Sequence, residues 1–204
     1  MSVLQNLTAI KMLQLKAFKF QLNNPFKWGN GWCAPLYCDD RKILSYPKIR
    51  NFVRIELARV IAEMYPDADV IAGVATNAIA HGVLVAEQLG LPFVYVHPTP
   101  KDHGLENQIE GDLRPRQSVV IVENQVNIGS NCLKVAKVLR ENGCKVLGVV
   151  TIFDYGFRRA SWAICSILCK LVRSEAISLA RNINIPLQPD RRLSAKHCDF
   201  HFAV

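Results

Sequence analysis

The fold is decided by residues 118–152, which are SVVIVENQVNIGSNCLKVAKVLRENGCKVLGVVTI. Residues 118–122 form a short β-branched run, the pattern of a buried strand. Residues 130–142 have helical spacing and are followed by Gly143, a residue type that commonly ends helices. Residues 146–152 form a second β-branched run. Strand, helix and strand in this order predict two parallel neighbouring strands joined by a helix.

The same order occurs upstream in the chain. Residues 70–74 (VIAGV) predict a strand, residues 78–89 a helix ended by Gly90, and residues 93–96 (FVYV) another strand. Two such units predict an α/β fold with a central parallel sheet flanked by helices. Because ligands of such sheets bind beyond the carboxyl ends of the strands, the candidate site lies in residues 76–77, 97–117 and 123–129.

The N-terminal part has a different pattern. Residues 3–18 predict an amphipathic helix, and residues 26–28 and 32–34 flank a Gly-Asn-Gly turn that predicts a hairpin. Ser45 is the expected N-cap of the next helix. We therefore expect a helix and small hood in residues 1–45, an α/β core in residues 46–181 with a helix over residues 160–181, and an unassigned tail in residues 182–204.

Composition limits the partners. The 204 residues carry a net charge of +8, and residues 1–50 hold eight Lys or Arg against Asp39 and Asp40. No run of like charges marks a nucleic-acid arm, so we expect a small phosphorylated ligand and no nucleic acid.

Seven cysteines without a CxxC pair predict no disulfide framework and no zinc site, and they suit a reducing compartment. No signal peptide and no membrane span is indicated. The sequence therefore predicts a cytoplasmic protein without a membrane partner.

Two segments are candidates for phosphate binding. Residues 97–117 are long for a loop and contain Lys101 and His103, which favours a mobile lid that neutralises charge, although an ordinary solvated loop has the same pattern. Residues 123–129 precede a helix whose free N–H groups form an anion site if the loop curls around it. Glu123 could accept hydrogen bonds from a sugar diol, or simply begin a polar turn. Neither a P-loop nor a GxGxxG motif is present.

A set of segments resembles the orotate phosphoribosyltransferases. They are WGNGW (28–32), APLYCDDR (34–41), LSYP (44–47), IAGVAT (71–76), IAHG (79–82), LPFVYV (91–96), PKDHGL (100–105) and NQIEG (107–111). The resemblance implies a type I phosphoribosyltransferase fold and a homodimer. It also implies Mg²⁺-dependent transfer of ribose 5-phosphate from phosphoribosyl pyrophosphate (PRPP) to orotate, giving orotidine monophosphate and pyrophosphate in pyrimidine biosynthesis.

The resemblance also implies roles for individual residues. Lys101 and His103 match the loop residues that reach the pyrophosphate from the neighbouring subunit, and Glu123 matches the first acid of the PRPP motif. Cys33, Tyr37 and Cys38 match the orotate side. The positions that match the PRPP-binding and phosphate-binding residues are Thr76, Asn77, His97, Asn124, Gln125, Val126, Asn127, Ile128, Gly129, Ser130 and Asn131.

Several of these positions depart from the family pattern. Where the family has a lysine, an arginine and often a second lysine, this chain has Cys33, His97 and Thr99. Where the family has a second acid and two hydroxyl side chains, this chain has Asn124, Asn127 and Ile128. The departures remove charges that would bind PRPP. Two hypotheses follow: a divergent orotate phosphoribosyltransferase, or a catalytically impaired relative that acts as a nucleotide-binding or partner-binding dimer subunit.

Overall fold

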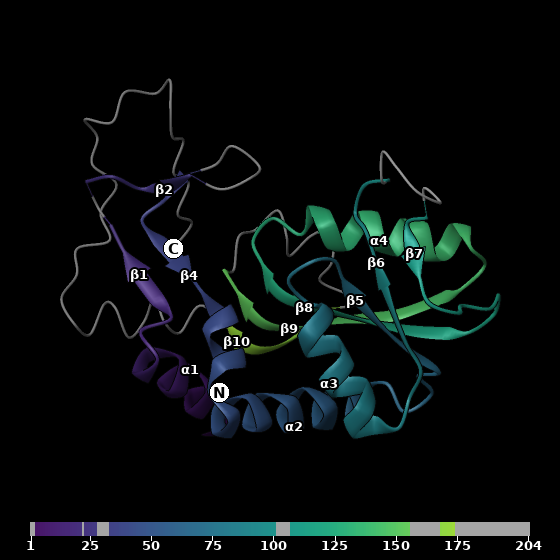
Figure 1. The fold of residues 1–204 in the computed structure, drawn as a ribbon, viewed down its shortest axis with the longest axis horizontal. Coiled ribbons are helices and arrows are strands. Elements are labelled where there is room, and N and C mark those ends of the chain that lie inside the picture. The colour runs from purple at the N-terminus through teal and green to yellow at the C-terminus, as the bar shows by residue number, and fades with distance from the viewer. Residues whose placement is uncertain (1–2, 22, 28–32, 101–106, 156–167, 174–204) are drawn as a thin grey trace.

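A central sheet organises the chain, as seen in a computed structural model that describes residues 3–21, 23–27, 33–100, 107–155 and 168–173 (Figure 1). Neighbouring strands pair in parallel, except for the antiparallel pair β6–β7. The strand order is β10 (Leu168–Arg173), β9 (Lys145–Asp154), β8 (Ser118–Val126), β5 (Val70–Val74), β6 (Phe93–Val96) and β7 (Ile109–Glu110). The expected parallel α/β sheet is therefore confirmed.

Helices cover both faces of the sheet (Figure 1). Helices α2 (Pro47–Met64) and α3 (Ile79–Leu89) pack on one face, and α4 (Ser130–Glu141) packs on the other. Successive residues of β8 pack alternately into the hydrophobic cores on the two faces of the sheet: Val120 packs on the α2 side and Ile121 on the α4 side. This alternation follows from the period of two in a strand, and it buries β8 in the middle of the protein.

The N-terminal segments form a small hood beside the sheet (Figure 1). Helix α1 (Val3–Gln14) leads to β1 (Phe18–Phe20), which pairs with β4 (Leu36–Cys38). Strands β2 (Phe26–Lys27) and β3 (Cys33–Ala34) form the predicted hairpin. The 3₁₀ helix η1 (Asp40–Ser45) follows β4.

Two expected boundaries near the N-terminus are wrong. The first helix ends at Gln14 because Lys16 adopts a left-handed conformation (φ 50°) and Phe18 enters β1, where its ring packs 5.3 Å from that of Phe153. Ser45 ends η1 instead of capping α2, whose N-cap is Tyr46 and whose first residue is a proline. Proline at this position supplies a preset φ in place of a side-chain cap.

Two expectations about the central part of the chain also need correction. The strand that begins at Ser118 continues through Glu123 to Val126, because β9 offers pairing partners as far as Asp154. The 97–117 interval is not all loop, since β7 pairs with β6 and the His97 N–H donates to the Gln108 carbonyl at 2.8 Å.

The expected helix over residues 160–181 contains a strand instead, β10, which pairs with β9 from Leu168 opposite Val149 to Arg173 opposite Asp154. A short apolar run fits a buried helix and a strand equally well, and the open edge of β9 decides for the strand.

Helices in the described ranges are all too short or too polar to cross a lipid bilayer.

Candidate functional site

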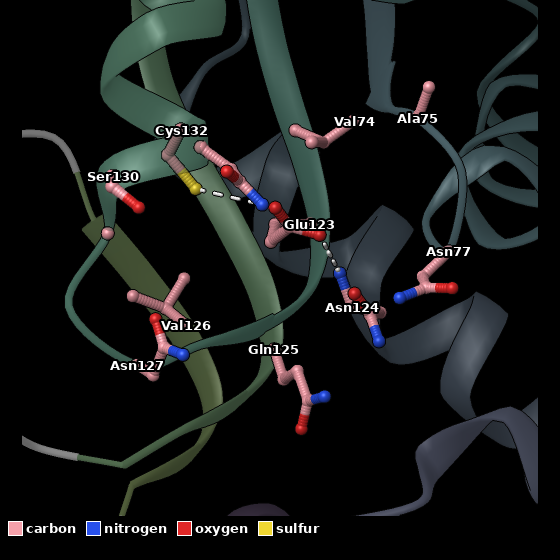
Figure 2. A pocket seen from close by; sticks show the side chains of 12 residues that line it. Val74, Ala75, Asn77, Glu123, Asn124, Gln125, Val126, Asn127, Ser130 and Cys132 are labelled. Atoms are coloured by element: carbon pink, nitrogen blue, oxygen red, sulfur yellow. Dashed lines mark hydrogen bonds between the residues drawn. The ribbon is translucent and has the colours of Figure 1, made fainter. Parts of the chain in front are cut away.

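A pocket of about 130 Å³ lies where β5 and β8 end and α4 begins (Figure 2). This is the position that parallel sheets of this class favour for ligands. The predicted residues that line it are Asn77, Glu123, Asn124, Gln125, Val126, Asn127, Gly129, Ser130 and Asn131. Val74, Ala75 and Cys132 complete the lining. Most of the residues predicted to bind phosphate therefore meet in one pocket at the carboxyl ends of the strands.

The start of α4 lines one end of the pocket. Gly129 is the N-cap residue with a φ of 74°, a left-handed conformation that glycine adopts without a steric penalty. Within the described residues, no side chain caps the start of α4 with a hydrogen bond. The first N–H groups of α4 and the helix dipole therefore favour an anion such as a phosphate.

The loop before α4 contains a hydrogen bond between the side chain of one residue and the backbone of the next. Its Asn127 side chain accepts a hydrogen bond from the Ile128 N–H, which stabilises the loop locally. Ile128 is not among the residues that line the pocket, so the apolar side chain at this position lies outside the pocket lining.

Glu123 is a buried acid inside the pocket. One carboxyl oxygen accepts the Asn124 N–H at 3.0 Å, and the Cys132 thiol lies 3.8 Å from the other (Figure 2). Burial raises the pKa of Glu123 to about 8, and the nearby Asp40 carboxyl adds to the effect. At neutral pH Glu123 is therefore mainly protonated, so its carboxyl group can donate a hydrogen bond as well as accept one.

Asn124 connects the pocket to the hood. Its Nδ2 donates a hydrogen bond of 3.0 Å to Oδ1 of Asp40, the first residue of η1. Asp40 is fully buried, and its Oδ2 has no hydrogen-bond partner within the described part of the chain. Burial raises the pKa of Asp40 to about 6. The pattern of residue types alone did not single out Asp40, whose only sequence signal is its place in the Asp-Asp pair after β4.

Tyr155 forms a second link between hood and sheet. Its hydroxyl accepts the Cys38 N–H at 3.0 Å and donates to Oε1 of the pocket residue Gln125 at 3.3 Å. Its ring packs edge-on against Phe153 at 4.8 Å. Burial raises the pKa of the phenol, which stays protonated. No sequence motif pointed to this residue.

Tyr37 and Cys38, which were expected on the orotate side, lie in the hood and do not line the pocket. Tyr37 on β4 packs near Phe26, and its hydroxyl accepts a hydrogen bond of 3.1 Å from Arg41. Cys38 is buried, and burial raises the pKa of its thiol. Cys33 pairs with Lys27 through the backbone of β3.

The remaining predicted residues have separate positions. Thr76 follows a cis peptide bond and lies beside the lining residues Ala75 and Asn77 without lining the pocket itself. His97 also lies outside the lining, with its ring 5.7 Å from that of Tyr95 and its buried Nε2 unpartnered within the described chain. The two expected pyrophosphate ligands, Lys101 and His103, lie outside the described residues.

A largely parallel sheet covered on both faces, with an anion-binding loop after its central strand and a small N-terminal hood, defines a phosphoribosyltransferase of type I. Solved structures share the fold. Orotate phosphoribosyltransferase from Aeropyrum pernix superimposes with a TM-score of 0.72 at 22% identity, over 87% of this chain and 99% of that chain. UMP synthase from Leishmania donovani gives a TM-score of 0.73 at 22% identity, over 90% of this chain and 39% of that longer chain.

Sequence similarity is more specific. The chain is 54% identical over 160 residues to orotate phosphoribosyltransferase of Porphyromonas gingivalis, which covers 78% of this chain and 76% of that protein. No family model matches the chain. At this identity and coverage, the chain belongs to the orotate phosphoribosyltransferase family.

Proposed function

We propose that this protein transfers ribose 5-phosphate from PRPP to orotate, giving orotidine monophosphate and pyrophosphate. The observation that carries the proposal is the pocket at the start of α4, which combines a backbone anion site with a buried acid, in a chain of this family. The comparisons offer no support for the alternative of a catalytically impaired relative.

The pocket suggests a division of roles. The N–H groups at Ser130 and Asn131 would bind the 5-phosphate, and Asn77 would lie beside the pyrophosphate. Glu123 and Asn124 would face the ribose hydroxyls. Positive charge builds up on the ribose ring as pyrophosphate leaves, so catalysis depends on stabilising the departing anion and fixing the ring. Lys101 and His103 are proposed for the pyrophosphate.

Mg²⁺ fits this pocket as part of the substrate. No group of three or more His, Cys, Asp or Glu side chains is placed to hold a metal among the described residues. Mg²⁺ commonly binds substrate phosphates and keeps several waters. We propose that the ion arrives on the PRPP diphosphate, where it neutralises part of the charge that leaves with pyrophosphate. The proposal includes a homodimer located in the cytoplasm.

The first test is formation of orotidine monophosphate by the purified protein with orotate, PRPP and Mg²⁺, with PRPP binding followed by calorimetry. Asn131→Asp places a negative charge in the first turn of α4, where it favours the helix but repels a phosphate. We expect at least tenfold weaker PRPP binding, about 1.4 kcal/mol, without loss of thermal stability.

Asn51→Asp is the control, because it makes the same change at the fifth residue of α2, at an exposed position outside the pocket. It should bind PRPP like the parent. PRPP binding without product formation by the parent would favour the impaired relative. A folded parent that neither binds PRPP nor forms product would contradict the proposed function.

A further inference from the structure

The pair formed by Asp40 and Asn124 has a consequence for substrate binding. Asn124 lines the pocket next to Glu123 (Figure 2). Its position corresponds to the second acid of the PRPP motif in the proteins that this chain resembles. An amide in place of a carboxylate removes a negative charge from the strand, and the structure shows where a carboxylate is found instead.

That carboxylate comes from the hood. Asp40 is 84 residues away in the chain, yet its Oδ1 lies 3.0 Å from Nδ2 of Asn124 and its side chain is fully buried. The adjacent Asp39 and Arg41 pair with each other at 3.0 Å and lie partly exposed. Asp40 therefore directs its carboxylate toward the sheet, whereas its neighbours form a separate ion pair.

The chemistry of the pair fixes the orientation of Asn124. A carboxylate only accepts hydrogen bonds, so it takes the Nδ2 end of the amide. The carbonyl end, Oδ1, is then left for another donor. A charged acceptor on Nδ2 also polarises the amide and strengthens its carbonyl as an acceptor. A ribose hydroxyl is a donor of the right kind for that carbonyl.

We propose that Asp40 is a positioning residue for the ribose of PRPP: it holds Asn124 with its carbonyl oxygen available to the pocket and keeps in this pair the negative charge that related proteins carry at position 124. The inference rests on the proposed function for the identity of the ligand. The pairing itself rests on the hydrogen bond and burial alone.

Exchange of the two side chains tests the proposal. Asp40→Asn keeps the shape but removes the charge, and we expect at least fivefold weaker PRPP binding, a matching rise in KM for PRPP, and a kcat within about threefold of the parent. Asn124→Asp places two carboxylates opposite each other without a donor, so both PRPP binding and stability should fall. The double variant Asp40→Asn with Asn124→Asp restores one amide and one carboxylate, and PRPP binding should return to within about threefold of the parent.

Asp39→Asn is the matched control, because it removes the same charge one residue away without touching Asn124. It should bind PRPP like the parent. Tighter PRPP binding by Asn124→Asp alone, or a double variant no better than the weaker single variant, would overturn the proposal. Equal PRPP binding by Asp40→Asn and the parent would reduce Asp40 to a structural role and would also overturn it.

Unfolding of the same four proteins separates this inference from the proposed function. If the parent does not bind PRPP, the proposed function fails, and the pairing is judged by the urea-unfolding cycle alone. Strongly non-additive free energies of unfolding, with the double variant more stable than Asn124→Asp, support the pairing. Additive values overturn it.

Discussion

Glu123 shows how burial sets the chemistry of a single residue in this pocket. Its carboxyl lies between the Asn124 N–H and the Cys132 thiol, and burial raises its pKa to about 8. In the unfolded chain the same carboxyl ionises near pH 4.5. Between these values the folded protein holds a proton that the unfolded chain has lost, so stability falls as the pH rises through this window.

Replacement of Glu123 by Gln removes this pH dependence. Asp40, with a pKa of about 6, makes stability fall mainly at lower pH, and the buried His81, whose pKa is lowered to about 4, makes stability rise as the pH rises toward its ordinary value of 6.5. Glu123 therefore makes the largest contribution to the fall in stability between pH 6 and 8. We expect the parent to lose about 2 kcal/mol of unfolding free energy across that range, at 1.36 kcal/mol per pKa unit, and the Glu123→Gln variant to lose much less. Urea denaturation at several pH values measures both.

The control for this prediction is Glu63→Gln, because Glu63 is 58% exposed in its pair with Arg59. It should show the same fall in stability as the parent. If the free energy of unfolding of the parent stayed constant between pH 6 and 8, the Glu123 carboxyl would be ionised in the folded protein. That result would contradict a protonated Glu123.

The residues of the pocket divide by how far apart they lie in the sequence. Those from Glu123 to Asn131 were predictable because one strand, one loop and one helix start bring them together locally. Asp40 and Tyr155, which do not line the pocket, were not, since each contacts a pocket residue through a hydrogen bond between distant segments: Asp40 to Asn124, and Tyr155 to Gln125. Residue type and spacing carry no information about such contacts before the hood is docked on the sheet.

At the scale of elements, α3 is held close to β5 and β6 by small residues. A Cβ atom at Gly82 would lie 2.6 Å from Cε2 of Phe93, and one at Gly73 would lie 3.0 Å from Cζ of the same ring. The ring therefore fills the space that the two glycines leave open.

Gly82→Ala should destabilise the protein although alanine favours helices over glycine by about 1 kcal/mol. The added methyl group forces Phe93 to move, and overpacking of this kind costs about 1–3 kcal/mol. Phe93→Leu should rescue part of the loss in the double variant, which urea unfolding would show as a coupling between the two sites. A Gly82→Ala variant as stable as the parent would indicate that the ring relocates freely.

The elements that the sequence predicted well are those with a local pattern. Strands β5 and β6 match their predicted bounds, and α3 and α4 match within a residue at each end. The misses within the central sheet share one cause, which is pairing between strands: β8 continues to Val126 because β9 extends beside it, and β7 and β10 exist because β6 and β9 have open edges. Pairing of this kind overrides local propensity.

At the scale of the whole molecule, the hood and the sheet act as two parts of one site. The ends of β5 and β8 and the start of α4 line the pocket, and the hood supplies Asp40, which contacts the pocket residue Asn124. Tyr155 joins the two parts from the end of β9, since its hydroxyl contacts both Cys38 and Gln125. Displacement of the hood would therefore disturb Gln125 and Asn124 together, even though neither residue belongs to the hood.

The resemblance implies that Lys101 acts on the pyrophosphate of the neighbouring subunit, and a mixed dimer tests this directly. Lys101→Ala removes the cation, whereas Asn131→Asp damages the phosphate end of the pocket, so each variant alone should have little activity. In a dimer with one subunit of each kind, a cation acting across the interface leaves one site with both defects and the other with none. Dimers purified through two different tags should then have about half the parent activity per dimer. Activity as low as that of the single variants would place Lys101 in its own subunit's site, and failure to recover any doubly tagged protein would contradict the homodimer.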